Sequence, residues 1–168
     1  MVDNSNPLLL SSGNPELKQS FNHFVMTRYG YTNTKKGQTF FAFASFNYTQ
    51  NYIGNSTIIA SHDTLLNDGV LLRTGSQFRR PVNINGGMNA SSFFTYGFPV
   101  TKIKCNFNFN AGFSFAQTPA LINNLQNLSN NYGISGGFVL SSNINEKIDF
   151  VINYNASYNI VKNNLQTT

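Results

Sequence analysis

The chain has 168 residues and a net charge of +5 at pH 7, and only 10% of its residues are Asp, Glu, Lys or Arg. A soluble domain usually has about 25% of these residues, so this chain has too few charges to cover an ordinary water-facing surface. Aromatic residues reach 14%, which excludes a disordered chain, because disordered segments lack aromatic and β-branched residues. The 27 Asn residues fill most polar positions, so the polar surface is largely uncharged.

The basic residues are scattered over expected turns and loops and form no basic helix. This pattern predicts no nucleic-acid partner. The single cysteine, Cys105, cannot form an internal disulfide or a metal site by itself. Residues Met1–Leu10 lack the basic region of a secretory signal, and no stretch has the roughly 18 apolar residues of a membrane helix. If the protein is exported, we expect its signal to lie on a part of the protein outside this chain.

Period-two alternation of apolar and polar residues dominates the chain and predicts strands. The clearest run has Ile103, Cys105 and Phe107 on one face and Lys104 and Asn106 on the other. In chain order, the expected strands are Ser20–Tyr31, Phe40–Tyr52, Val82–Phe98, Ile103–Phe115, Tyr132–Ser141 and Lys147–Ile160.

The expected connections alternate between short and long. The short turns are Thr34–Gln38, Pro99–Thr101 and Asn143–Glu146, and the long loops are Gly54–Pro81 and Thr118–Asn130. The second long loop has apolar residues at helical spacing between Ala120 and Leu128, which predicts one helical turn there. The sequence therefore predicts an all-β fold, an antiparallel up-and-down meander of about six long strands that spans residues 1–168 as one segment.

Three features favour a transmembrane β-barrel over a soluble β-sandwich, which has the same alternation. Several strands reach a dozen residues, close to the 9–11 that a tilted membrane strand needs. Short turns at one end and long loops at the other are typical of outer-membrane barrels. The uncharged polar face suits a wet lumen. Tyrosines also fall near both expected ends of the strands, where barrels carry aromatic girdles. They are Tyr29, Tyr31 and Tyr96 near the short turns, and Tyr48, Tyr52, Tyr132 and Tyr158 near the long loops.

The segment Gly13-Asn14-Pro15-Glu16-Leu17-Lys18, directly before a strand, resembles the "GNPxLKPE" element of TonB-dependent receptors and the related outer-membrane β-barrel family. In that family the element ends an extracellular loop and leads into a descending strand. Gln19 stands where the second Pro is usual. Two further segments are similar to the family, Arg80-Pro81-Val82-Asn83 and the stretch from Asn143 to Phe150. The resemblance implies that residues 1–18 form the end of an extracellular loop.

The resemblance also implies a function: nutrient uptake across the outer membrane of a Gram-negative cell, with barrel residues in a structural role. The implied partners are outer-membrane lipid and lipopolysaccharide, the rest of the barrel, a plug domain and the TonB complex. Six strands are fewer than the eight of the smallest single-chain bacterial barrels, so we expect the chain to be part of a larger barrel.

Candidates for catalysis or ligand binding are few. Ser61, His62 and Asp63 are the residue types of a hydrolytic triad, but adjacency in sequence does not bring a triad together in space. Asp63 and Asp68 share a loop without the spacing of a calcium site, and His23 has no nearby metal-type partner. Gly86-Gly87 and Gly136-Gly137 precede no helix with a Lys, so they are not phosphate loops. We predict no catalytic residue, no metal and no cofactor.

Two alternatives stay open. Arg73, Arg79 and Arg80 in the first long loop either contact lipopolysaccharide phosphates or remain solvated. The whole chain could instead be a soluble or surface-exposed antiparallel sheet that binds a glycan or a partner protein. Burial of the row formed by Phe107, Phe109, Phe113 and Phe115 against a second layer would favour this second reading. An outer-membrane enzyme, in which a His meets a Ser and an acid in space, is a third reading.

Overall fold

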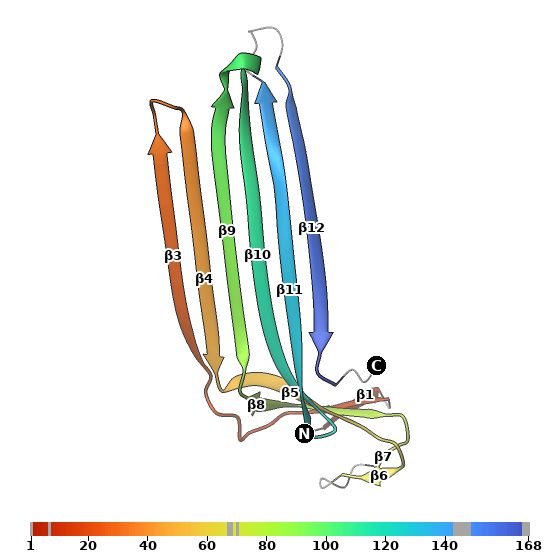
Figure 1. Ribbon diagram of the computed structural model, residues 1–168. Helices are drawn as coiled ribbons and strands as arrows, with labels where there is room; N and C mark the ends of the chain where they lie inside the picture. Colours follow the sequence, from red (N-terminus) through yellow and green to blue (C-terminus); the bar gives the residue numbers. More distant parts are fainter. Residues whose placement is uncertain (1, 7, 67–68, 70, 143–148, 166–168) are drawn as a thin grey trace.

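A computed structural model describes residues 2–6, 8–66, 69, 71–142 and 149–165. This part of the chain is all-β, as predicted, and its single helical element is the three-residue 3-10 turn η1 (Thr101–Ile103). Figure 1 shows two regions, a set of long strands standing side by side and a smaller group of strands that runs across their lower ends.

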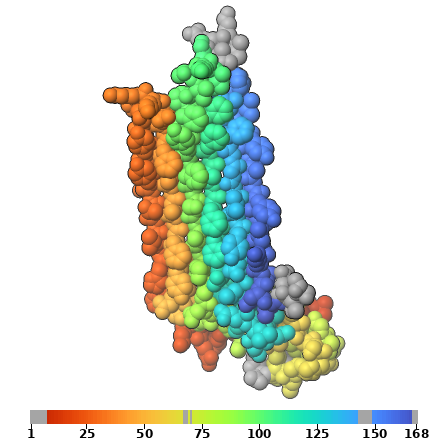
Figure 2. Space-filling model, viewed as in Figure 1, coloured from red at the N-terminus to blue at the C-terminus, as the bar shows by residue number. Residues whose placement is uncertain are grey.

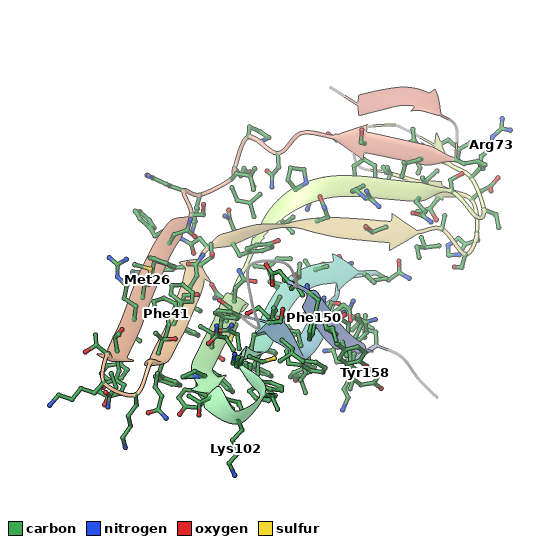
Figure 3. All side chains as sticks on the ribbon, turned by 90° about the horizontal axis from the view of Figure 1, so that it is seen from above. Met26, Phe41, Arg73, Lys102, Phe150 and Tyr158 are labelled. Carbon is green, nitrogen blue, oxygen red and sulfur yellow. The ribbon has the colours of Figure 1, made fainter. Side chains whose placement is uncertain are left out.

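The first region, here called the long sheet, contains six strands, and each neighbouring pair is antiparallel. Alternating apolar and polar residues make these strands, because successive side chains point to opposite faces of a sheet. In spatial order they are β3 (Phe21–Asn33), β4 (Gln38–Gln50), β9 (Gly87–Val100), β10 (Cys105–Ile122), β11 (Leu125–Ser142) and β12 (Val151–Asn163). Seen end-on, they follow an arc rather than a plane (Figure 3).

The second region, here called the lobe, contains the six shorter strands β1 (Val2–Asn6), β2 (Leu9–Ser12), β5 (Tyr52–Ile59), β6 (Thr64–Leu65), β7 (Leu71–Leu72) and β8 (Gln77–Ile84). The buried apolar cluster of the described residues lies here, and its members are Leu10, Ala60, Leu72 and Phe78, with Ile58 and Leu66 packed against them. The lobe therefore has a hydrophobic core of its own, built by the chain between β4 and β9 together with β2.

The predicted meander is correct in part. The long strands are antiparallel, but the sheet as a whole is mixed, because β2 pairs with β8 and β5 pairs with β10 in parallel. β4 and β9 are also neighbours although four strands lie between them in sequence. Within the described residues the sheet is open, and β3 and β12 form its two long edges.

The prediction that Gly54–Pro81 is a loop is wrong. Most of β5 and β8 and all of β6 and β7 fall in this range. Its apolar residues are not arranged in one long alternating run, so period-two counting misses them. They are buried instead by folding back on β2, a long-range contact that local pattern does not contain.

The prediction that Thr118–Asn130 is a loop with one helical turn is also wrong. β10 continues to Ile122 and β11 begins at Leu125. The connection is a two-residue turn in which Asn123 and Asn124 have φ of 49° and 64°. Two consecutive residues with positive φ make the hairpin turn that matches strand twist, and Asn tolerates this conformation well. The tip is fixed because the Asn123 N–H donates to the Thr57 carbonyl over 2.9 Å.

Two expected strands are each divided. Phe40–Tyr52 ends at Gln50, and the chain turns at Asn51, where φ is 52°, so that Tyr52 belongs to β5. Val82–Phe98 is split at Gly86, where φ is 105°, a value that favours glycine. Each break places one end of the expected run in a strand of the lobe.

Two of the three expected short turns lie on described residues, and both are present. The turn expected at Thr34–Gln38 lies between β3 and β4, and the turn expected at Pro99–Thr101 is displaced to η1 and Lys104. The turn Asn143–Glu146 lies outside the described residues, as does most of the Asn143–Phe150 segment. The expected loop over residues 1–18 contains the hairpin of β1 and β2 before the chain enters β3.

Candidate functional site

The largest distinctive surface is one face of the long sheet, here called the aromatic face. Cross-strand pairing aligns one aromatic residue from each of six strands into a continuous row, and the row is Tyr31, Phe40, Tyr96, Phe109, Phe138 and Tyr154. Two neighbouring pairs of this row pack ring on ring, with centroids 6.4 Å apart for Phe109 and Phe138 and 5.9 Å for Phe138 and Tyr154. Such cross-strand aromatic pairs stabilise a sheet.

The prediction of which residues share this face is confirmed where ring contacts test it. Phe107 stacks on Phe98 and on Phe109 with centroids 6.0 Å apart in each case. Along β3, Tyr29 packs on Phe40 and His23 stacks on Tyr48. The odd-numbered residues of β3 therefore belong to the aromatic face.

The aromatic face is open to its surroundings. Phe109 is 42% exposed, Phe113 is 44% exposed and Tyr158 is 65% exposed. No second layer of the described residues covers these rings, and Figure 2 shows the long sheet as a slab of strands above the bulkier lobe. The burial that would favour a sandwich is therefore not found within the described chain.

Charge is excluded from the central part of the aromatic face. From the level of Phe98 on β9 to the level of Ile160 on β12, its described residues include no Asp, Glu, Lys or Arg. The first polar level follows towards the lobe and contains His23, Gln117 and Lys162. The face is thus an apolar band with a defined polar border at the end near the lobe.

The opposite face, here called the polar face, has two parts. Over β10, β11 and β12 it carries mainly Asn, Ser and Gly. Over β3, β4 and β9 it carries a patch of large apolar residues, in which Phe43 lies directly across from Phe93. The members of this patch are Phe24, Met26, Phe41, Phe43 and Phe93. The opposite face is therefore apolar over part of β3, β4 and β9.

Two adjoining hollows lie between the two parts of the polar face. One of about 260 Å³ and one of about 320 Å³ share Ser91 and Ser114 in their linings. Gly112 and Gly133 keep the first hollow open, because a Cβ on Gly112 would lie 2.8 Å from the Ser135 hydroxyl. No charged side chain lines either hollow.

The segment Gly13–Lys18 and the segment Arg80–Asn83, both singled out in the sequence, are joined in space. The Asn14 side-chain amide donates to the Pro81 carbonyl over 3.0 Å. The Lys18 N–H donates to Asn83 Oδ1 over 2.7 Å, and Asn83 Nδ2 donates back to the Lys18 carbonyl over 2.9 Å. Asn83 Nδ2 also donates to the Asn51 carbonyl over 2.9 Å. Asn83 therefore ties the lobe to the entrance of β3, a role that no sequence pattern indicated.

The residues of the possible hydrolytic triad do not form one. Ser61 Oγ lies 3.1 Å from His62 Nδ1, but both residues are exposed. Asp63 is bound elsewhere, since its Oδ1 accepts from the Thr74 N–H over 2.8 Å and from the Thr74 hydroxyl over 2.9 Å. These two hydrogen bonds, the backbone one first, lower the pKa of Asp63 below its ordinary value.

The remaining ligand candidates are also separated. Asp68 lies outside the described residues, and the described part of the chain holds no group of three His, Cys, Asp or Glu that could bind a metal. Arg79 and Arg80 are consecutive in β8 and so point to opposite faces of that strand. Arg80 shares a groove of about 590 Å³ with Glu16, whereas Arg73 lies at the outer end of the lobe (Figure 3). The three arginines therefore do not converge on one phosphate.

Comparison with known proteins gives no match: no protein-family model, no curated protein and no solved structure is similar to this chain. The family resemblance of Gly13–Lys18 thus remains a prediction. The described residues form no helix that is long and apolar enough to cross a membrane.

Proposed function

We propose that the long sheet is part of the wall of a Gram-negative outer-membrane β-barrel, in a transporter or receptor of the TonB-dependent kind. The observation that carries this proposal is the aromatic face: apolar residues on six adjacent strands that are exposed and without charge at their centre. In water this surface would favour aggregation, whereas hydrocarbon solvates it at no cost.

The height of the apolar band supports the proposal. From Phe150, directly before β12, to Ile160 in β12 the band runs over ten residue steps, about 33 Å along a strand at roughly 3.3 Å per residue. A tilt of about 40° reduces this to about 25 Å, which is the height of the lipid-facing band of outer-membrane barrels. The row from Tyr31 to Tyr154 lies near the end of the band that carries the β3–β4 and β9–β10 turns, here called the short-turn end. Outer-membrane barrels carry an aromatic girdle near each end of the lipid-facing band.

Under this proposal, further strands complete the wall at the open edges of the sheet. The outer sides of β3 and β12 have no strand partner among the described residues. Lipid does not tolerate unpaired backbone groups, so a barrel must close. The polar face would then line the interior, and its patch around Phe43 and Phe93 would contact an internal plug domain. The lobe, at the end opposite the short turns, would lie at the external entrance.

Substitution to arginine on the two faces of β10 tests the proposal. Phe109→Arg places a charge inside the apolar band of the aromatic face and should impair assembly, at a cost in folding free energy of at most the about 2–4 kcal/mol that an arginine has at the bilayer midplane. Asn110→Arg, one residue away at almost the same depth, should cost little because it faces the interior. Assembly of the full-length protein is measured by protease protection and by the heat-dependent gel shift of folded barrels. Equal effects of the two variants, or recovery of the wild-type protein in solution without detergent, would refute the proposal.

A second candidate function is a surface-exposed sheet that binds a neutral glycan or a partner protein. The hollows of the polar face favour it, since Ser and Asn side chains around Ser91 and Asn131 offer hydroxyl and amide groups beside the exposed ring of Phe24. Under this reading the protein would be recovered without detergent, and Asn131→Ala would weaken ligand binding while Phe109→Arg would leave solubility unchanged.

A further inference from the structure

A groove of about 590 Å³ in the lobe is lined by one acidic and one basic side chain, Glu16 and Arg80. Glu16 belongs to the segment Gly13–Lys18, which was singled out in the sequence, and Arg80 belongs to β8. The volume lies within the roughly 300–1,000 Å³ that is usual for small-molecule sites. Neither the groove nor its two charges has a role in the proposed function.

The floor of the groove is apolar. It is formed by Phe78, which is nearly buried as part of the core of the lobe, and by Ile58, which lies directly across from Phe78 on β5. Leu65 and Leu66 also line the groove, and Leu65 is exposed. A ligand that covers these side chains removes apolar surface from water, which favours its binding.

The two charged residues are held on neighbouring segments of the lobe. Arg80 extends from the same face of β8 as Phe78, because side chains two residues apart in a strand share a face. The Asn14 side chain holds Glu16 beside this strand. Its amide donates to the Pro81 carbonyl over 3.0 Å, and its Oδ1 accepts from the Glu16 N–H over 3.0 Å.

Neither charged side chain is paired within the described structure. Glu16 and Arg80 are both exposed, and their side chains make no hydrogen bond or ion pair with a described residue. They line one groove without joining across it, so a ligand there meets a carboxylate and a guanidinium beside an apolar floor. This arrangement is complementary to a molecule with a positive end, a negative end and an apolar middle.

We propose that this groove binds a short apolar peptide with free ends. The Arg80 guanidinium takes the terminal carboxylate, because its planar fork matches a carboxylate with two parallel hydrogen bonds. The Glu16 carboxylate takes the terminal ammonium group, and the apolar side chains of the peptide cover Leu65 and Leu66. All the residues of the groove belong to the lobe and the segment after it, so the inference does not require the aromatic face to lie in lipid.

Other ligand classes match fewer of these features. A neutral sugar leaves both charges without a partner. A simple anion pairs with Arg80 but leaves Glu16 and the apolar floor unused. A free-ended peptide uses the two charges and the floor together.

The test measures the binding of trileucine to the full-length protein by isothermal titration calorimetry, with a titration into the buffer and any detergent alone as the blank. Trileucine amide lacks the carboxylate, and N-acetyltrileucine lacks the ammonium group. All three peptides are titrated into the wild type, Arg80→Gln and Glu16→Gln. Arg79→Gln is the matched control, because Arg79 neighbours Arg80 but points to the opposite face of β8 and does not line the groove.

We expect either modification of the peptide to weaken binding to the wild type by roughly tenfold, as the loss of a hydrogen bond between charged groups does. Amidation should then have no further effect on Arg80→Gln, and acetylation should have none on Glu16→Gln. Arg79→Gln should behave as the wild type. Leu65→Ala should weaken the binding of all three peptides alike, because it removes apolar contact and no charge.

Failure of trileucine to bind the wild type would overturn the proposal, and so would equal binding of the three peptides. An effect of amidation that persists in Arg80→Gln would place the carboxylate elsewhere and would also overturn it. Binding of acetate as tightly as trileucine would show a simple anion site, and binding of maltotriose but not trileucine would show a glycan site. Either result would overturn the peptide proposal and leave the barrel proposal to its own test on β10.

Discussion

The lobe and the long sheet belong to one chain but differ in how far their apolar side chains are buried. In the lobe, Leu72 is 0% exposed and Phe78 is 7% exposed, inside a cluster that the chain closes by itself. In the long sheet, rings such as Phe113 remain nearly half exposed. The hydrophobic effect stabilises the lobe through burial within the protein. The described residues of the long sheet give its rings no such burial, so the two regions differ in what stabilises their apolar side chains.

The largest effect within the lobe is expected from Leu72→Ala. Removal of a fully buried leucine side chain costs about 2–5 kcal/mol, because both transfer energy and packing are lost. Native-state hydrogen exchange of the lobe amides measures this cost. Leu65→Ala is the matched control, since Leu65 is 67% exposed in the same lobe and should cost under about 0.5 kcal/mol. Equal costs for the two variants would contradict the burial of Leu72 in the core of the lobe.

A smaller effect is expected at the junction of the two regions. Asn83→Ala removes one acceptor and one donor group that together make three hydrogen bonds, to Lys18 and Asn51. We expect a loss of about 2 kcal/mol in the stability of the junction, because unpaired backbone groups are left behind. Asn85→Ala is the control, since the Asn85 side chain is exposed and makes no hydrogen bond in the described structure. Limited proteolysis near residue 83 would detect the opening, and equal cleavage of both variants would contradict this role for Asn83.

The smallest effect is the pH response of the loop that contains Asp63. Its pKa is lowered in the folded state by the hydrogen bonds from Thr74. A lowered pKa means that this contribution to stability is present above the unfolded value of 3.8 and is lost as pH falls through the lower folded value. The protection of the Thr74 amide against hydrogen exchange, relative to its intrinsic exchange rate, should therefore decrease below about pH 4. Asp63→Asn should remove that response, and an unchanged pH profile in this variant would contradict the assignment.

Sequence reasoning succeeded where a strand is long and strictly alternating. The run around Phe107 and Phe109 predicts both β10 and the face that each residue occupies, because pleating alone fixes the direction of the side chains. It failed where partners are distant in sequence. The parallel pairing of Leu121 with Ser56 and the bonds of Asn83 depend on how separate segments meet, and no local period encodes that.

The prediction of a loop around Asn123 and Asn124 was wrong for a different reason. The nearby leucines have helical spacing, but two adjacent Asn residues can adopt positive φ and close a hairpin. At this site the preference of the two Asn residues for a hairpin turn outweighed the helical spacing of the leucines. Of the candidate surfaces, the membership of the aromatic face could be predicted, whereas the apolar patch around Phe43 on the other face could not, because three strands had to be aligned to bring its members together.

The directions of the two edge strands limit how many further strands could join them in an antiparallel ring. Five antiparallel steps separate β3 from β12, so these strands run in opposite directions. An all-antiparallel ring that joins them must add strands in even number, since an odd number would place two parallel strands side by side. A closed all-antiparallel ring built on these six strands would therefore have an even number of strands.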